Sequence, residues 1–197
     1  MIRRKNSGLS ALVKDMKAIA DEAQARFGVL TVPQLNWKPS AEQWSVGQIF
    51  DHLIKSSEPY RSIITRVASG QYHARAWERI SPLSGFWGRV VLRAVSPESP
   101  KKIKAPRVFQ PSSSSVDDAV VRRFVSLQFA IAELMARTES LNLDKIIITS
   151  PVSSLFTYSL FDAYRILNSH GRRHLSQAQR LADLARGKLP LETGGYA

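Results

Sequence analysis

The sequence contains no cysteine in its 197 residues. This absence excludes disulfide bonds, a thiolate nucleophile and any metal site built on cysteine ligands. Long apolar runs are missing too, because charged residues interrupt each hydrophobic stretch well before the roughly 20 residues that a membrane-spanning helix needs. The basic start of the chain is followed by Lys14, Asp15 and Lys17, where a signal peptide would be apolar. We therefore expect a cytoplasmic protein without a membrane span.

Acidic residues are scarce relative to basic ones. There are 16 Asp and Glu against 28 Lys and Arg, which gives a formal net charge of +12. An excess of this size makes an anionic partner worth considering. The basic residues are scattered in small clusters, however, and none forms the run interleaved with aromatics that single-strand binders use. We expect a solvated basic surface, and we do not expect nucleic acid to be the main partner.

The pattern of apolar residues predicts a helical protein. Hydrophobic residues make up 44% of the chain and charged residues 22%, as in globular domains, so residues 1–197 are expected to form a single domain. Apolar residues recur every three and four positions in four segments, which is the period of amphipathic helices. The segments run from about Leu9 to Phe27, from Ser45 to Gly70, from Val120 to Glu139 and from Leu160 to Gly187, before Pro190.

The connections between these segments constrain how the helices are arranged. Gly28–Trp44 is of moderate length, so the first two helices are expected to be antiparallel neighbours. Gln71–Ser115 is much longer and holds five of the ten prolines; only Gly85–Val95 within it has a helical pattern. Such a connection can return the third helix parallel to the second, and the β-prone run Asp144–Thr149 is too isolated to define a sheet. The sequence thus predicts an all-α four-helix bundle with one long crossover.

Histidine is rare, and two of the four histidines share a helix face. His170 and His174 are four residues apart, so both imidazoles can hold one metal ion. His52 lies at the edge of the apolar stripe of the second helix and could meet them across an interhelical gap of about 8–10 Å. His73 lies too far along the chain to join them. Three imidazoles with an open position are typical of catalytic zinc.

Two simpler interpretations of the histidines stay open. A pair at a spacing of four also arises by chance, and a histidine near an apolar face is often a packing residue. If the three do bind a metal, binding should fade as the pH falls through about 6.5, where free imidazole becomes protonated.

Two runs of sequence resemble a known family. Residues 35–53 read LNWKPSAEQWSVGQIFDHL, with a Trp-Ser helix start followed by a His-Leu pair in the same helix. Residues 170–179 read HGRRHLSQAQ and contain the pattern His-x-x-x-His-Leu-x-Gln. These motifs, in this order, resemble those of the DinB/YfiT-like family, and with the helix lengths and the long crossover the resemblance covers most of the chain.

The resemblance implies a fold and a metal site. It implies a four-helix bundle of up-down-down-up topology, often a homodimer, which binds a divalent ion such as zinc or nickel through three histidines. Matched motif by motif, these ligands are His52, His170 and His174. Members of the family include thiol-dependent S-transferases, isomerases and hydrolases, and the family's association with DNA damage does not imply DNA binding.

Three polar residues are candidates to support a metal-bound water. Gln48 and Ser56 lie one turn on either side of His52, and Tyr164 lies about two turns before His170. The alternatives are a capping glutamine, a helix-surface serine and a core tyrosine.

Four further residues lie close to the candidate ligands in sequence. Arg172 and Arg173 flank the ligands and either attract an anionic substrate or face solvent. Asp51 is expected on the surface, and Trp44 is expected to cover the start of the second helix.

The leading functional hypothesis is a metal-dependent enzyme that acts on a small-molecule substrate, as a thiol transferase or a hydrolase. Because the chain has no cysteine, a thiol would come from a low-molecular-weight cofactor. The alternative is a non-catalytic, metal- or ligand-binding dimeric bundle with a stress or interaction role. Turnover that needs the metal distinguishes the two.

Overall fold

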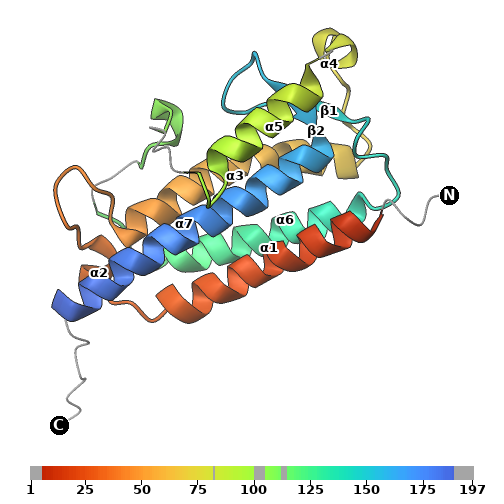
Figure 1. Ribbon diagram of the computed structural model, residues 1–197. Coiled ribbons are helices and arrows are strands. Elements are labelled where there is room, and N and C mark those ends of the chain that lie inside the picture. The colour runs from red at the N-terminus through yellow and green to blue at the C-terminus, as the bar shows by residue number, and fades with distance from the viewer. Residues whose placement is uncertain (1–5, 82, 100–104, 112–114, 189–197) are drawn as a thin grey trace.

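The computed structural model describes residues 6–81, 83–99, 105–111 and 115–188, and these are mostly helical (Figure 1). The long helices are α1 (Asn6–Phe27), α3 (Val46–Ala68), α6 (Val120–Arg137) and α7 (Leu160–Lys188). The shorter helices are α2 (Val32–Asn36), α4 (Ala76–Ile80), α5 (Ser84–Val95) and the 3₁₀ turn η1 (Arg107–Phe109). Two short strands, β1 (Ile147–Thr149) and β2 (Thr157–Ser159), complete the described elements. The all-α class is confirmed.

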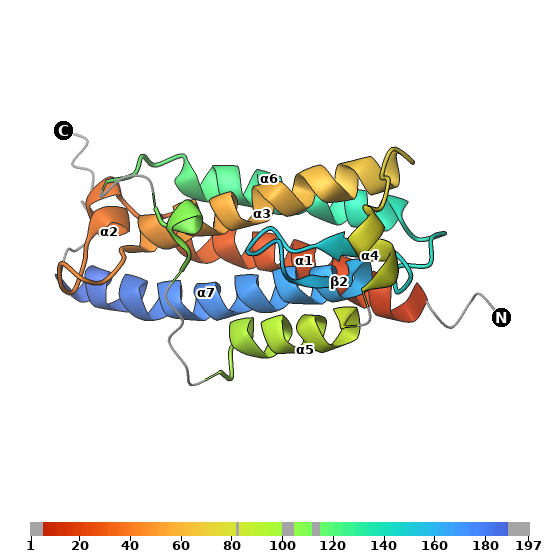
Figure 2. The ribbon, with the colours of Figure 1, turned by 90° about the horizontal axis from the view of Figure 1, so that it is seen from above.

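The four long helices lie side by side (Figures 1 and 2). Helix α1 packs against α6 and α7, and α3 packs against the same two helices, so the expectation that the first two long helices are neighbours was wrong: α6 and α7 lie between them over most of their length. Followed along the chain in Figure 1, α3 and α6 run in one direction and α1 and α7 in the other. The helix pair α3 and α7, which carries the candidate ligands, is therefore antiparallel and in direct contact.

Local sequence signals place the start and the end of α3. Ser45 accepts a hydrogen bond from the Gln48 backbone N–H, and the Gln48 side chain accepts one from the Ser45 N–H. This reciprocal capping box satisfies two donors that a helix start leaves unpaired. Gly70, with a positive φ of 73°, follows the end of the helix. The predicted bounds of this helix are confirmed within two residues.

The core fills the space between the long helices as two clusters of buried side chains. In one of them the Phe50 ring lies 5.2 Å from the rings of Phe27 and Phe124, so α1, α3 and α6 meet around Phe50. In the same cluster, Gly171 lets α7 approach α1 closely, since a Cβ there would lie 3.3 Å from Ile19 Cδ1. The long helices are thus packed directly against one another, which fixes α3 relative to α7.

Two expectations about the connections were incomplete. Gly28–Trp44 is not merely a loop, because Thr31 and Gln34 form a second capping box that starts α2. The crossover contains α5 as predicted, but it also contains α4 and η1. The Thr-x-x-Gln spacing was the available signal for α2, whereas five and three residues are too few to show a helical period in sequence.

The expectation that the β-prone run stays isolated was wrong. Ile147–Thr149 pairs antiparallel with Thr157–Ser159, so Ile148 lies opposite Tyr158. Short strands of three residues give no alternation that sequence analysis can recognise, and their pairing depends on a loop that folds back. At the other end of α7, Gly187 lies inside the helix rather than ending it, and Pro190 falls outside the described residues.

Within the described ranges, no helix combines the length and the apolar character that crossing a membrane would require.

Candidate metal centre

Helices α3 and α7 bring the three predicted histidines together. His52 projects from α3, and His170 and His174 project from successive turns of α7. The centroid of the His52 ring lies 5.2 Å from that of His170 and 4.8 Å from that of His174, and the two α7 rings lie 4.6 Å apart. One ring nitrogen from each histidine lies within 4.8 Å of the other two. This is a cluster that could hold a metal ion.

Hydrogen bonds outside the cluster orient two of the rings. His52 Nδ1 lies 2.7 Å from the Phe109 carbonyl oxygen, and His174 Nδ1 lies 3.1 Å from Gln177 Oε1. Both oxygens are acceptors, so each Nδ1 carries the proton and each Nε2 presents a lone pair. Histidines that ligate metals are typically held in this way by a carbonyl or a side-chain oxygen.

The separation of the ligand nitrogens suits a metal. His52 Nε2 lies 3.2 Å from His170 Nε2. Two nitrogens bound at zinc–nitrogen distances of about 2.0–2.1 Å in a tetrahedral site would lie about 3.3 Å apart. Without a metal the same separation allows His170 Nε2–H to donate to His52 Nε2. This pair of nitrogens therefore fits a divalent ion with no large movement of either ring, and the third ligand nitrogen lies within 4.8 Å of both.

Burial keeps the three imidazoles neutral. It lowers the pKa of His52, although the hydrogen bond to the Phe109 carbonyl opposes the shift. Burial lowers the pKa of His174 to about 3. Burial also lowers the pKa of His170 well below its ordinary value, and a proton on His170 would be repelled by Arg173 and by any proton on His174 or His52. Neutral imidazoles are the form that binds metal. Protons should thus compete with a metal at a lower pH than the value near 6.5 expected for free imidazole.

One face of the cluster is covered by a tryptophan. The Trp44 ring lies 5.0 Å from the His52 ring, just before α3 begins. His52 is only 4% exposed, whereas His170 and His174 are partly exposed. Trp44 therefore covers His52, as predicted for the start of the second helix, and the cluster reaches the surface on the α7 side.

The three candidate supporting residues all have structural partners. Gln48 completes the capping box with Ser45, and the Ser56 hydroxyl donates to the Leu53 carbonyl within α3. The Tyr164 hydroxyl lies 3.0 Å from Thr138 Oγ1 inside the core. Gln48 and Tyr164 thus match the capping glutamine and the core tyrosine given above, whereas Ser56 is 8% exposed and is not the expected helix-surface serine. Any further role of the three at the histidines stays a prediction.

Sequence analysis assigned no role to Phe109 or Gln177, although Gln177 is the last residue of the pattern His-x-x-x-His-Leu-x-Gln. The Phe109 contact is made by a backbone carbonyl, so the identity of its side chain carries no signal. Gln177 could have been assigned, because it lies three residues after His174 and side chains at this spacing meet on a helix.

The two arginines that flank the ligands in sequence have different surroundings. Arg172 points to α1, where its guanidinium pairs with Asp15 and Glu22 at 2.6 Å each, a pairing that the sequence did not predict. Arg173 donates to the carbonyl oxygens of Ser96 and Ser99 at the end of α5. Its positive charge contributes to the lowered pKa of both His170 and His174.

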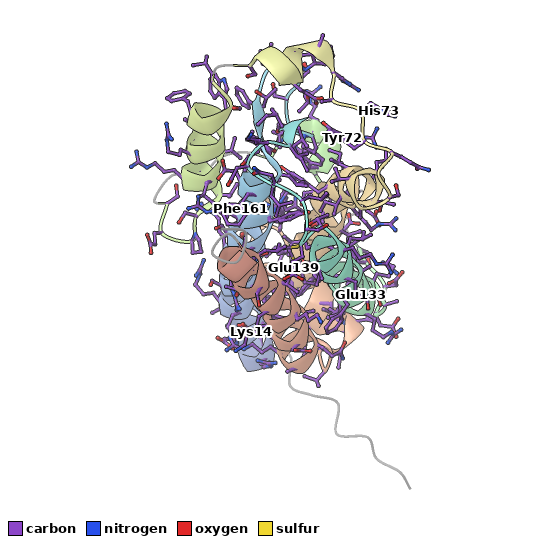
Figure 3. All side chains as sticks on the ribbon, turned by 90° about the vertical axis from the view of Figure 1, so that its right-hand side faces the viewer. Lys14, Tyr72, His73, Glu133, Glu139 and Phe161 are labelled. Carbon is purple, nitrogen blue, oxygen red and sulfur yellow. The ribbon has the colours of Figure 1, made fainter. Side chains whose placement is uncertain are left out.

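Two more residues lie outside the cluster, as predicted, although the Asp51 side chain is only 18% exposed rather than on the surface. His73 is exposed and lies beside Tyr72 in the segment that follows α3 (Figure 3), and it is not part of the cluster. Asp51 carries an ion pair with Lys55 at 3.6 Å on α3, and its carboxylate is not part of the cluster.

The comparison with protein families agrees with this geometry. The model of the DinB superfamily matches residues 16–178, a span that contains both sequence motifs and all three histidines. The chain belongs to the DinB superfamily. No curated protein and no solved structure matches it. For this DinB-superfamily chain, membership and the three-histidine cluster rest on independent observations, a sequence profile and a set of interatomic distances.

Proposed function

We propose that this protein binds one divalent ion through Nε2 of His52, His170 and His174 and catalyses a metal-dependent reaction on a small molecule. The observation that carries the proposal is the convergence of three neutral imidazoles from two helices, two of them oriented by an outer hydrogen bond. A packing role would not require three ring nitrogens to face one another.

The number of ligands favours catalysis over a purely structural ion. Among the residues that the structure describes, the cluster has three ligands, whereas structural zinc sites are typically closed by four. A divalent ion with an open position would supply Lewis acidity and lower the pKa of a bound water or thiol. Zinc and nickel both accept imidazole ligands.

Residues around the histidines would orient the ligands and limit the access of water to the metal site. Phe109 and Gln177 hold the rings of His52 and His174, and Trp44 excludes water from one side of His52. Since the chain has no cysteine, a thiol-transfer reaction would use a low-molecular-weight thiol, and hydrolysis would use water. We propose one of these two reaction types, S-transfer or hydrolysis.

The proposal extends to the molecule that carries the site. We propose that residues 1–197 form one domain, an up-down-down-up four-helix bundle that assembles as a cytoplasmic homodimer and does not have nucleic acid as its main partner. The mutual packing of α1, α3, α6 and α7 and the direction of each helix support the bundle.

Calorimetric titration of metal-stripped protein with zinc or nickel tests the metal site. We expect about one ion per chain, and replacement of His52, His170 or His174 with Ala should weaken binding at least about 100-fold, because two imidazoles remain. His73→Ala is the matched control and should bind like the wild type. Unchanged affinity in His52→Ala would contradict a site shared between α3 and α7.

A second experiment separates catalysis from metal storage or structure. The metal-loaded protein is screened with low-molecular-weight thiols and electrophiles, and with hydrolysable esters and amides. Turnover that disappears in His170→Ala supports the enzyme. A stoichiometric ion with no turnover across the screen supports the non-catalytic alternative.

A further inference from the structure

A second concave site lies on the other side of α7 from the histidine cluster. It is a groove of about 870 Å³ between α1, α5 and α7, and Figure 2 shows α5 running alongside α7 at the edge of the molecule. Its volume falls within the range of about 300–1,000 Å³ that is common for small-molecule sites. None of the three histidines lines it. Its chemistry is therefore separate from that of the metal centre.

Arginines dominate the polar lining of the groove. Arg89 and Arg93 lie one turn apart on α5 and are exposed, and neither has a hydrogen bond or ion pair with another described residue. Arg165, on the opposite wall, pairs with Asp162 at 3.3 Å. A guanidinium offers five donors in a planar fork that matches carboxylate and phosphate oxygens. The α5 wall thus presents two such forks that no described residue uses.

The acidic residues of the lining do not cancel this charge. Arg172 pairs with Asp15 and Glu22, and Arg165 pairs with Asp162, so neither adds uncompensated charge. Arg89 and Arg93 remain against one other acidic lining residue, Glu98, which leaves a net charge of +1. Asp15 is already neutralised, since its carboxylate accepts hydrogen bonds from Arg172 and Asn168. The uncompensated charge at the groove is positive and lies mainly on α5.

Apolar side chains share the α5 wall with the free arginines. Phe86 is 49% exposed and Val90 40% exposed, and both line the groove. They are not needed to dock the helix, because Trp87 stacks on Phe156 at 4.3 Å and Gly88 lies directly against Asp162. Their spacing with the arginines places them on one face of α5. This face combines apolar surface with anion-binding groups.

We propose that the groove binds a small amphipathic anion. Its carboxylate, phosphate or sulfonate head group is held by Arg89 and Arg93, and its apolar body lies against Phe86 and Val90. Charge-assisted hydrogen bonds from paired guanidiniums fix the head group, and burial of Phe86 and Val90 contributes the hydrophobic part of the affinity.

Calorimetry with soluble decanoate and decyl phosphate, below their micelle-forming concentrations, tests this site on metal-free wild-type protein. We expect one anion per chain. Arg89→Gln/Arg93→Gln should weaken binding at least about tenfold. The matched control is Arg137→Gln/Arg180→Gln, which removes the same charge from exposed arginines outside the groove that likewise have no described partner. It should bind like the wild type.

Three comparisons decide whether the assigned chemistry is right. Decyltrimethylammonium, with the same chain and a positive head, should not bind, and equal binding would overturn the anion selectivity. Inorganic phosphate should bind more weakly than decyl phosphate, and equal affinity would overturn the apolar contribution. Cosedimentation with phosphatidylglycerol vesicles, without a one-to-one complex with soluble decanoate, would replace the groove ligand with a membrane surface. Wild-type affinity in Arg89→Gln/Arg93→Gln would overturn the proposal outright.

Discussion

At the scale of single residues, the histidine cluster depends on atoms outside it. His52 Nδ1–H donates a hydrogen bond to the Phe109 carbonyl of η1, and His174 Nδ1–H donates one to Gln177 Oε1. Each ring is thereby limited to one tautomer and one orientation. A ring held in this way needs no reorganisation before its Nε2 binds an ion. Burial also favours metal binding, because it lowers the pKa of His52 and His174 and so keeps both imidazoles neutral.

Gln177 should therefore tune the metal affinity without touching the ion. Gln177→Ala removes the acceptor for His174 Nδ1–H, and loss of such a partner typically lowers metal affinity about 10–100-fold. Titration with zinc measures the loss. Gln179→Ala is the control, because Gln179 lies two residues on and bonds Asp183 and Arg26 instead. Equal affinities in the two variants would assign no role to the Gln177 hydrogen bond.

The lowered pKa values also predict how stability depends on pH in the metal-free protein. Histidines in the unfolded chain take up protons near pH 6.5, whereas His174 in the folded protein does so only near a pKa of about 3. As the pH falls below about 6.5, the unfolded state binds more protons than the folded state, so the free energy of unfolding decreases. Above about pH 6.5 the histidines are neutral in both states, so their full contribution to the free energy of unfolding is present.

Urea unfolding at pH values between about 5 and about 7.5 measures this dependence, in a window above the range where carboxylates titrate. His174→Asn should flatten the profile. A variant profile as steep as that of the wild type would show that other groups cause the loss.

Among the secondary-structure elements, sequence patterns predicted the features that depend on residues within one helix. The stripe of α7 placed His170 and His174 on one face, and the Ser45–Gln48 capping box placed the start of α3. The meeting of His52 with the α7 pair depends on packing between helices that lie more than 100 residues apart in the chain. Spacing within one helix could not supply this contact, and the family motifs pointed to it instead.

The Glu78 side chain connects two elements that the sequence did not predict, α4 and the paired strand β1. This residue of α4 is 4% exposed, and its carboxylate accepts hydrogen bonds from the Arg75 and Thr149 backbone N–H groups and from the Tyr72 and Thr149 hydroxyls. Burial raises the pKa of Glu78, but these bonds outweigh it and hold the pKa below its ordinary value. One carboxylate thus joins α4 to β1. Such a contact between distant segments carries no periodic signal in the sequence.

Glu78→Gln should destabilise the protein although it changes only one atom. The amide has a single acceptor oxygen, so its NH₂ group must face donors, and the expected loss is about 2–4 kcal/mol in the free energy of unfolding. Denaturant unfolding measures it. Glu133→Gln, on the exposed face of α6 (Figure 3), makes the same chemical change and should alter stability by less than about 0.5 kcal/mol. Similar losses in both variants would contradict the role of the carboxylate.

At the scale of the whole molecule, the crossover from α5 to α6 is fastened to the helices that carry the histidines. Arg173 of α7 bonds the carbonyls of Ser96 and Ser99, and Lys55 of α3 bonds that of Gln110. His52 itself bonds Phe109 between them. The histidine cluster is thus the meeting point of α3, α7 and the crossover, so that an ion held there would link three parts of the fold.

Metal binding should accordingly stabilise the whole fold. An ion that binds only the folded state adds about 2.7 kcal/mol when its free concentration is 100 times Kd, which corresponds to an increase in Tm of about 5–10 °C for a domain of this size. Thermal unfolding with zinc or nickel, and after addition of a chelator, measures the shift. Magnesium should have no effect, because it prefers oxygen ligands. His52→Ala and His170→Ala should each lose the shift while His73→Ala keeps it, and a shift of the same size in all three variants would place the stabilising ion elsewhere on the protein.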